Sequence, residues 1–188
     1  MPTIAKHNEF ITVIIIFAVA PEQQQELINS IVEFVEAEVK YQPGFVSSSL
    51  HKSLDGIRVL NYAQWKTLED YKAFLRNLRP QVVEGARWIA RAASNMTDFR
   101  LRSLFIGHAQ DEHRDFQMLE RNYVSVGGEL DEISQAEKNI GSEALSAFIF
   151  HQASHENPID LIGSMFIIEG LGNKLAGKWA EQIRQTLG

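Results

Sequence analysis

Apolar and polar residues follow two different periods along the chain. Residues 10–20 (FITVIIIFAVA) are rich in β-branched side chains with almost no polar break, which predicts a buried central strand. Two further strand-like runs, 45–52 and 59–65, are divided by Ser53-Leu54-Asp55-Gly56, whose Asp-Gly pair is typical of a hairpin turn. The pattern therefore predicts three strands in the first 65 residues.

Helical periods lie between and after these runs. Pro21-Glu22 opens a first helix, and Thr67, with Asp70 three residues on, opens a second through a variant capping box. Pro80 is expected to begin a further helix, and the alternating stretch 97–106 (TDFRLRSLFI) predicts a half-exposed fourth strand. The resulting order is a split β-α-β layout, with helices covering one face of an antiparallel sheet.

The period becomes helical from His108 onward. We expect helices at about 107–126, 130–155 and 158–186, separated by Gly-Gly and Asn-Pro pairs. The sequence thus predicts an α+β, ferredoxin-like domain at 1–106 and an all-α three-helix domain at 107–188.

Composition narrows the classes of function. A chain of 188 residues without cysteine has no disulfide or thiolate metal site, so the cytoplasm is the expected compartment. A net charge of −6, with no run of Lys and Arg, argues against a nucleic-acid partner. The apolar run near the N-terminus is about half a membrane span and lacks a preceding basic region, so neither membrane insertion nor a signal peptide is expected.

Four features carry a resemblance to a known family. They are the long apolar first strand, the helix opened by Pro21-Glu22, the turn Gln42-Pro43-Gly44-Phe45, and the stretch 62–71 (YAQWKTLEDY). In these the chain resembles the antibiotic biosynthesis monooxygenase (ABM) family of dimeric α+β barrels. The resemblance implies a half-barrel that dimerises sheet to sheet, with a small apolar pocket between sheet and helices. Members of that family oxidise polyketide aromatics without a cofactor, degrade haem, or have no known activity.

The haem-degrading branch is a poor match. It uses an asparagine on the first strand, a tryptophan ending the third strand and a histidine on the next helix. Trp65 matches the tryptophan, but isoleucines 14–16 and residues 74–76 (FLR) stand where the other two would fall, so haem is not expected. The polar residues that could face a substrate pocket beside Trp65 are His51 and Asn61, although each also fits an exposed strand position.

The second half resembles part of another family, the haem-oxygenase-like (TenA-type) iron-dependent oxidases. The resemblance rests on residues 108–119 (HAQDEHRDFQML) and 158–171 (PIDLIGSMFIIEGL). It implies iron ligands at Glu112 and Glu169. The family's histidine three residues after the first ligand is replaced by Asp115, and a further ligand helix of that family would fall beyond the end of this sequence.

The residues themselves point to a candidate metal site in the same region. Glu112 interrupts an apolar helical stripe, with His108 and Asp115 flanking it on one face, and a buried carboxylate is costly unless it is paired, neutralised or metal-bound. His151 and His155 have the i, i+4 spacing at which two imidazoles can share one ion. Such ligands suit iron or another divalent metal. A structural network of hydrogen bonds is the favoured explanation of the same residues, and a metal site is the alternative.

Two functions follow as expectations. The first is a monooxygenase or O2-dependent oxidoreductase acting on a small apolar organic substrate. The alternative is a non-enzymatic dimerisation or ligand-binding module with a helical interaction domain. The family resemblance implies a homodimer. A third possibility is that the helical half is a remnant whose bundle is completed by exchange between subunits, because three amphipathic helices without a fourth leave an apolar face that a higher homo-oligomer would cover.

Overall fold

A computed structural model describes residues 9–161 of the chain. By their internal contacts these residues form two compact units, 9–71 and 72–161, and the division falls within one long helix. The first unit is α+β and the second is helical, which confirms the predicted fold class. No helix among residues 9–161 is long and apolar enough to cross a membrane.

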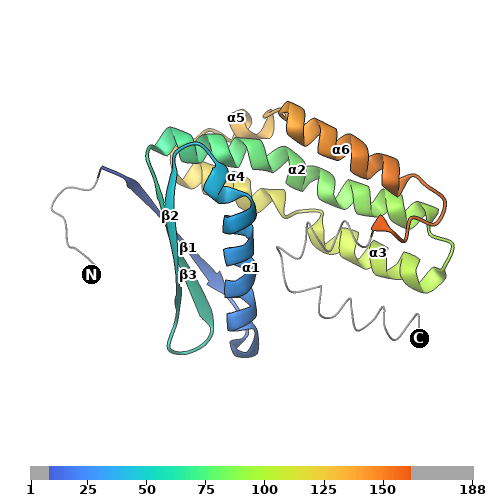
Figure 1. The fold of residues 1–188 in the computed structure, drawn as a ribbon, viewed down its shortest axis with the longest axis horizontal. Coiled ribbons are helices and arrows are strands. Elements are labelled where there is room, and N and C mark those ends of the chain that lie inside the picture. Colours follow the sequence, from blue (N-terminus) through green and yellow to red (C-terminus); the bar gives the residue numbers. More distant parts are fainter. Residues whose placement is uncertain (1–8, 162–188) are drawn as a thin grey trace. The chain divides into compact units, whose positions relative to one another are not determined.

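The first unit contains an antiparallel sheet of three strands (Figure 1). These are β1 (Ile11–Ala18), β2 (Phe45–Lys52) and β3 (Arg58–Trp65), in the order β1-β3-β2. The three predicted strands are confirmed. The hairpin between β2 and β3 turns at Gly56, whose φ of +79° is a conformation that glycine adopts without strain.

Two short 3-10 helices and one α-helix complete this unit. They are η1 (Pro21–Gln23), α1 (Gln24–Ala37) and η2 (Val39–Tyr41). Proline at the first position of η1 is compatible with a helix start because its missing N–H needs no partner there. The buried Gln24 amide donates to the backbone oxygens of Ser53 and Arg58, at 3.2 and 2.9 Å, and so ties α1 to the hairpin.

The prediction of a buried central β1 was wrong for the described sheet. β3 is central, and β1 pairs only with β3, from Ile11 opposite Trp65 to Ala18 opposite Arg58. Burial alternates along β1, and the Ile14 and Ile16 side chains are 57% and 62% exposed. The unbroken apolar run therefore reflects a sheet with two apolar faces, one of which is exposed among the residues that the structure describes.

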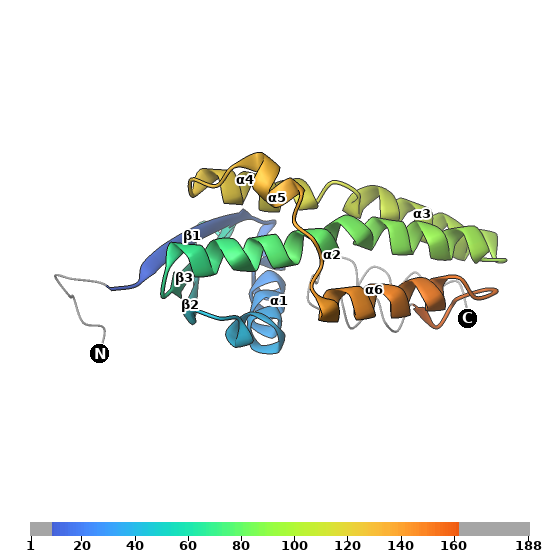
Figure 2. The same ribbon diagram turned by 90° about the horizontal axis from the view of Figure 1, so that it is seen from above.

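The second unit is built on α2 (Leu68–Asn95), whose residues from 72 onward lie between α3 (Phe99–Glu112) and α6 (Ile140–Ala153) in both ribbon views (Figure 2). The remaining helices are α4 (Phe116–Ser125) and α5 (Leu130–Ser134). The prediction that Pro80 begins a new helix was wrong. Pro80 lies inside α2. A proline there removes one helical hydrogen bond, and tertiary packing of the buried ring offsets that loss.

The expected helices of the second half are shorter than predicted. The helix predicted at 107–126 is broken at 113–115, and that predicted at 130–155 is broken at 135–139. The helix predicted at 158–186 lies outside the described residues after position 161.

The predicted fourth strand at 97–106 was also wrong, because this segment opens α3. The Asp98 carboxylate caps the helix by accepting from the backbone N–H groups of Arg100 and Leu101, at 2.7 and 3.0 Å. Leu101 and Phe105 are buried one turn apart, whereas Phe99, which a strand would place on their side, is 76% exposed. The predicted domain boundary at residue 106 rested on this strand. By internal contacts the described residues divide between Tyr71 and Lys72, and a separate domain at 107–188 stays a prediction.

Candidate functional site

A cluster of buried aromatic and polar side chains lies where β3 ends and α2 begins. Alternation along β3 places Asn61 and Trp65 on the buried face of the sheet, with exposed fractions of 8% and 1%. Tyr71, in the first turn of α2, is 3% exposed. We treat Asn61, Trp65 and Tyr71 as the candidate site.

The aromatic rings of this cluster hold one another at fixed angles. Phe45 of β2 lies opposite Trp65 in the strand register, and the two ring centroids are 5.4 Å apart at an interplanar angle of 78°. On its other side Trp65 lies 5.5 Å from the Tyr71 ring. Edge-to-face contacts of this kind favour one relative orientation, so the rings form a rigid apolar wall.

Asn61 is the polar member on the sheet. The Ser48 hydroxyl of β2 donates to Asn61 Oδ1 at 2.6 Å. Because the oxygen is held in this way, the two N–H groups of the amide form the donor side of Asn61. A buried amide oriented by a neighbouring hydroxyl can recognise an oxygen of a bound ligand.

Tyr71 is a hydrogen-bond donor rather than a base. Burial raises its pKa to about 12. The phenol therefore stays protonated at neutral pH, because burial in a poorly polar environment disfavours the phenolate. Tyr71 and Asn61 are therefore two uncharged hydrogen-bond donors in an apolar environment.

The start of α2 determines where Tyr71 lies. The Thr67 backbone N–H donates to the Asp70 carboxylate and the Asp70 N–H donates to the Thr67 hydroxyl, each at 3.1 Å, so the predicted capping box is confirmed. Gly44 packs against this cap: its φ is +79°, its carbonyl oxygen accepts from Lys66 N at 2.7 Å, and any Cβ there would overlap the Asp70 side chain. The turn before β2 and the start of α2 are therefore in close contact, with no room for a side chain at position 44.

Of the three pocket residues predicted from the sequence, the structure brings together Asn61 and Trp65. His51 lies opposite Leu60, on the other face of the sheet, and is exposed. The register shift between Phe45 and Ser47 reverses which residues of β2 face the core, so His51 no longer shares a face with Phe45. This register shift has no clear signature in the sequence.

Sequence reasoning missed Tyr71 and Ser48 as members of the site. Tyr71 had a usable signal, because the predicted capping box at 67–70 places the next residue in the first turn of a helix that follows Trp65 directly. Ser48 had none, because three consecutive serines at 47–49 are indistinguishable until the register of β2 is known.

The candidate metal ligands do not gather into one site in the described part of the chain. Within residues 9–161 there is no group of three or more His, Cys, Asp or Glu residues placed to hold a metal ion. The His108 side chain is buried on α3. The pKa of Asp115 is raised, because partial burial and the charge of Asp111 outweigh the opposite effect of His108 and His113. Glu112 is only half-buried.

The other predicted ligands differ in where they lie. His151 and His155 are exposed, so they do not point inward as expected. Glu169 lies outside the described residues, and the resemblance of 107–188 to iron-dependent oxidases remains a prediction.

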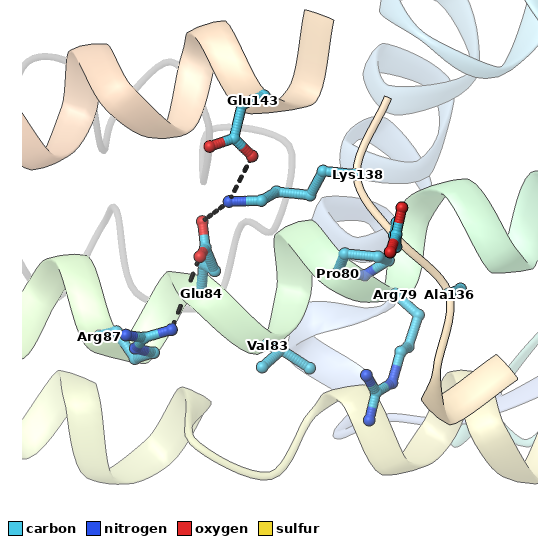
Figure 3. A pocket seen from close by; sticks show the side chains of 9 residues that line it. Arg79, Pro80, Val83, Glu84, Arg87, Ala136, Lys138 and Glu143 are labelled. Carbon is cyan, nitrogen blue, oxygen red and sulfur yellow. Dashed lines mark hydrogen bonds and ion pairs between the residues drawn. The ribbon is translucent and has the colours of Figure 1, made fainter. Parts of the chain in front are cut away.

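The helical unit also carries a charged hollow of about 400 Å³ beside Pro80 (Figure 3). Lys138 reaches across it and bonds both Glu84 and Glu143 at 2.9 Å. These hydrogen bonds raise the pKa of Lys138. Because the charges satisfy one another, the hollow is best explained as an ion-pair network that joins α2 to the start of α6.

Known proteins match the first part of the chain. The antibiotic biosynthesis monooxygenase family matches residues 10–83. A curated tetracenomycin-F1 monooxygenase from Streptomyces glaucescens is 41% identical over 81 residues, which cover 43% of this chain and 72% of that protein. No solved structure matches the chain significantly. Asn61, Trp65 and Tyr71 all lie within the span that the family matches.

Proposed function

This chain belongs to the antibiotic biosynthesis monooxygenase family, and from that premise we propose that its first unit is a monooxygenase for a small aromatic substrate. The observation that carries the proposal is the buried set Asn61, Trp65 and Tyr71, which places neutral hydrogen-bond donors against an aromatic wall. Such a site suits a flat, apolar molecule that carries a phenolic or keto oxygen.

The proposed reaction draws its electrons from the substrate. An aromatic ketone whose ring methylene is conjugated with the carbonyl, as in an anthrone, loses a proton to solvent water to give an enolate, which reacts with O2. The balance is CH2 + O2 → C=O + H2O: one oxygen atom enters the substrate, the other leaves as water, and the four electrons come from the two C–H bonds. The step that the protein can favour is formation of the enolate.

The candidate residues have distinct parts in this proposal. The Tyr71 phenol, protonated because its pKa is about 12, and the amide N–H groups of Asn61 donate to the developing enolate oxygen. Trp65 packs against the ring system of the substrate. Ser48 is a positioning residue, because it orients the Asn61 amide without being proposed to touch the substrate.

A homodimer that forms through the open face of the sheet is part of the proposal. Ile14 and Ile16 are exposed on that face, and Leu60 and Tyr62 lie beside them in the register. A contiguous apolar sheet face of this kind is costly in water and is typically covered by a partner. The lack of cysteine in the chain favours a cytoplasmic setting.

The experiment is oxygen consumption by the full chain with a hydroxylated anthrone, measured against spontaneous autoxidation. We expect Tyr71→Phe and Asn61→Ala each to lower kcat/KM about tenfold or more, as for loss of one donor to a developing oxyanion. Glu33→Ala, at an exposed position of α1 away from both the site and the open sheet face, is the control and should leave the rate unchanged.

The alternative is a non-enzymatic dimerisation or ligand-binding module with a helical interaction domain. It would be favoured if the wild-type chain bound the anthrone, detected by quenching of tryptophan fluorescence, but consumed no oxygen above the spontaneous rate. Sedimentation of the wild type and of Ile14→Lys tests the dimer: the wild type should sediment as a dimer and the variant as a monomer.

A further inference from the structure

Two histidines at the end of α6 converge on one point in space. The Nε2 atoms of His151 and His155 are 3.2 Å apart, whereas their ring centroids are 4.7 Å apart. Because the nitrogens are closer together than the rings, both imidazoles direct Nε2 inward. Both side chains are exposed, so the point between them is open to solvent.

The separation of the two nitrogens matches that of a shared metal ion. With metal–nitrogen bonds of about 2.0–2.1 Å, two ligands of a tetrahedral ion are about 3.3 Å apart. The two nitrogens lie at hydrogen-bond distance, and an ion that binds between them would be met by a lone pair from each ring.

The backbone keeps the two rings one helical turn apart. α6 ends at Ala153, but the turn continues, since Ser154 N–H donates to His151 O at 3.1 Å and His155 N–H donates to Gln152 O at 3.2 Å. The chain therefore continues as a tighter i→i−3 turn past the end of the regular helix, and this turn places His155 beside His151.

Hydrogen bonds to α2 hold this turn in place. Arg91 Nε donates to the Ser154 hydroxyl at 3.0 Å, and the Asn95 amide donates to the Ala153 carbonyl at 2.9 Å. Asn157, just after the pair, donates its N–H to the Asn95 carbonyl at 3.1 Å. A chelating pair on an anchored turn loses little conformational entropy when it binds.

The surroundings also favour a cation. The pair lies at the C-terminus of α6, where the helix dipole places partial negative charge. Nitrogen ligands without sulfur suit Zn²⁺, Cu²⁺ and Ni²⁺. We propose that His151 and His155 form a bidentate binding site for one divalent transition-metal ion, with water in the remaining coordination positions.

The test uses the untagged full chain, titrated with Zn²⁺ by calorimetry and with Cu²⁺ by electron paramagnetic resonance. We expect one ion per chain at this site and a Cu²⁺ spectrum with coupling to two imidazole nitrogens. His151→Gln and His155→Gln should each lose about tenfold or more in affinity, and the double variant should be little weaker than either single one, because a chelate fails when one arm is removed.

His113→Gln is the matched control, since it removes another exposed histidine of the same unit and should leave this affinity unchanged. Circular dichroism verifies that each variant is folded, and the substitutions are all at exposed positions. The proposal is overturned if the single variants bind as tightly as the wild type, if their losses simply add, or if the copper spectrum lacks coupling to two nitrogens.

Discussion

Gly44→Ala provides a quantitative test of how β2 and α2 are joined. The residue has φ +79°, and a left-handed conformation costs a non-glycine residue about 1–2 kcal/mol. The new Cβ would also overlap the Asp70 side chain, so Asp70 must move and the cap at the start of α2 is lost, at a cost of about 1 kcal/mol. Together these predict a loss of about 2–3 kcal/mol in the free energy of unfolding.

Two glycines of the same chain provide matched controls. Gly56 has the same φ of +79°, but a Cβ there would meet only Pro21, whose Cβ is the nearest atom at 3.3 Å, so Gly56→Ala isolates the backbone cost of about 1–2 kcal/mol. Gly85 lies within α2, and a methyl group added there would have no neighbouring atom within 4 Å. Gly85→Ala should therefore stabilise the chain by about 0.5–1 kcal/mol.

The assay is urea unfolding followed by far-ultraviolet circular dichroism, with all variants measured at the same protein concentration. Gly44→Ala should shift the midpoint further than Gly56→Ala, and the thermal unfolding temperature should fall by about 2–4 °C for each kcal/mol lost. If Gly44→Ala costs no more than Gly56→Ala, the overlap with Asp70 contributes nothing and the reasoning is refuted.

Three further predictions concern stability. Glu120→Ala should lower the free energy of unfolding in urea by about 2 kcal/mol, because Arg79 would lose its ionic partner. Arg79 donates to the Glu120 carboxylate at 3.1 and 2.7 Å, and its side chain is only 15% exposed. Glu36→Ala, which breaks an exposed ion pair, should change the free energy of unfolding by under about 0.5 kcal/mol. Asp98→Ala should cost about 1 kcal/mol by removing the cap of α3, and an unchanged midpoint would contradict that role. Burial raises the pKa of Tyr71 from 10.0 to about 12, so the folded chain retains a proton that the unfolded chain loses. The associated stability is fully present below pH 10 and is lost as the pH rises toward 12, by about 1.4 kcal/mol per pH unit, and Tyr71→Phe should lack this loss in unfolding curves measured from pH 9 to 11.

Most local elements of the first unit were predictable from the sequence. The strands are confirmed because β-branched runs and an Asp-Gly turn act over a few residues, and the capping box at Thr67 and Asp70 is likewise local. The segment 97–106 was mistaken for a strand because alternate and helical spacing both accommodate Leu101 and Phe105. The deciding feature is the Asp98 cap, which the prediction did not consider.

The candidate site was only partly predictable. Asn61 and Trp65 follow from the period of β3, since residues four apart in a strand share a face. His51 fitted both a pocket and an exposed strand position in the sequence, and it lies on the exposed face because the register shift near the start of β2 reverses the faces of that strand. For the metal candidates, spacing identified His151 and His155 as a pair but could not tell that the pair faces solvent.

The sequence by itself determined the three described strands, the turn between β2 and β3, the starts of the first two predicted helices and the family, because each depends on the identity and spacing of neighbouring residues. Tertiary structure alone decided that β1 lies at an edge of the described sheet, that α2 continues through Pro80, and that Ser48 orients Asn61. These depend on contacts between residues far apart in the chain, whose free energies outweigh local preferences once the core is packed.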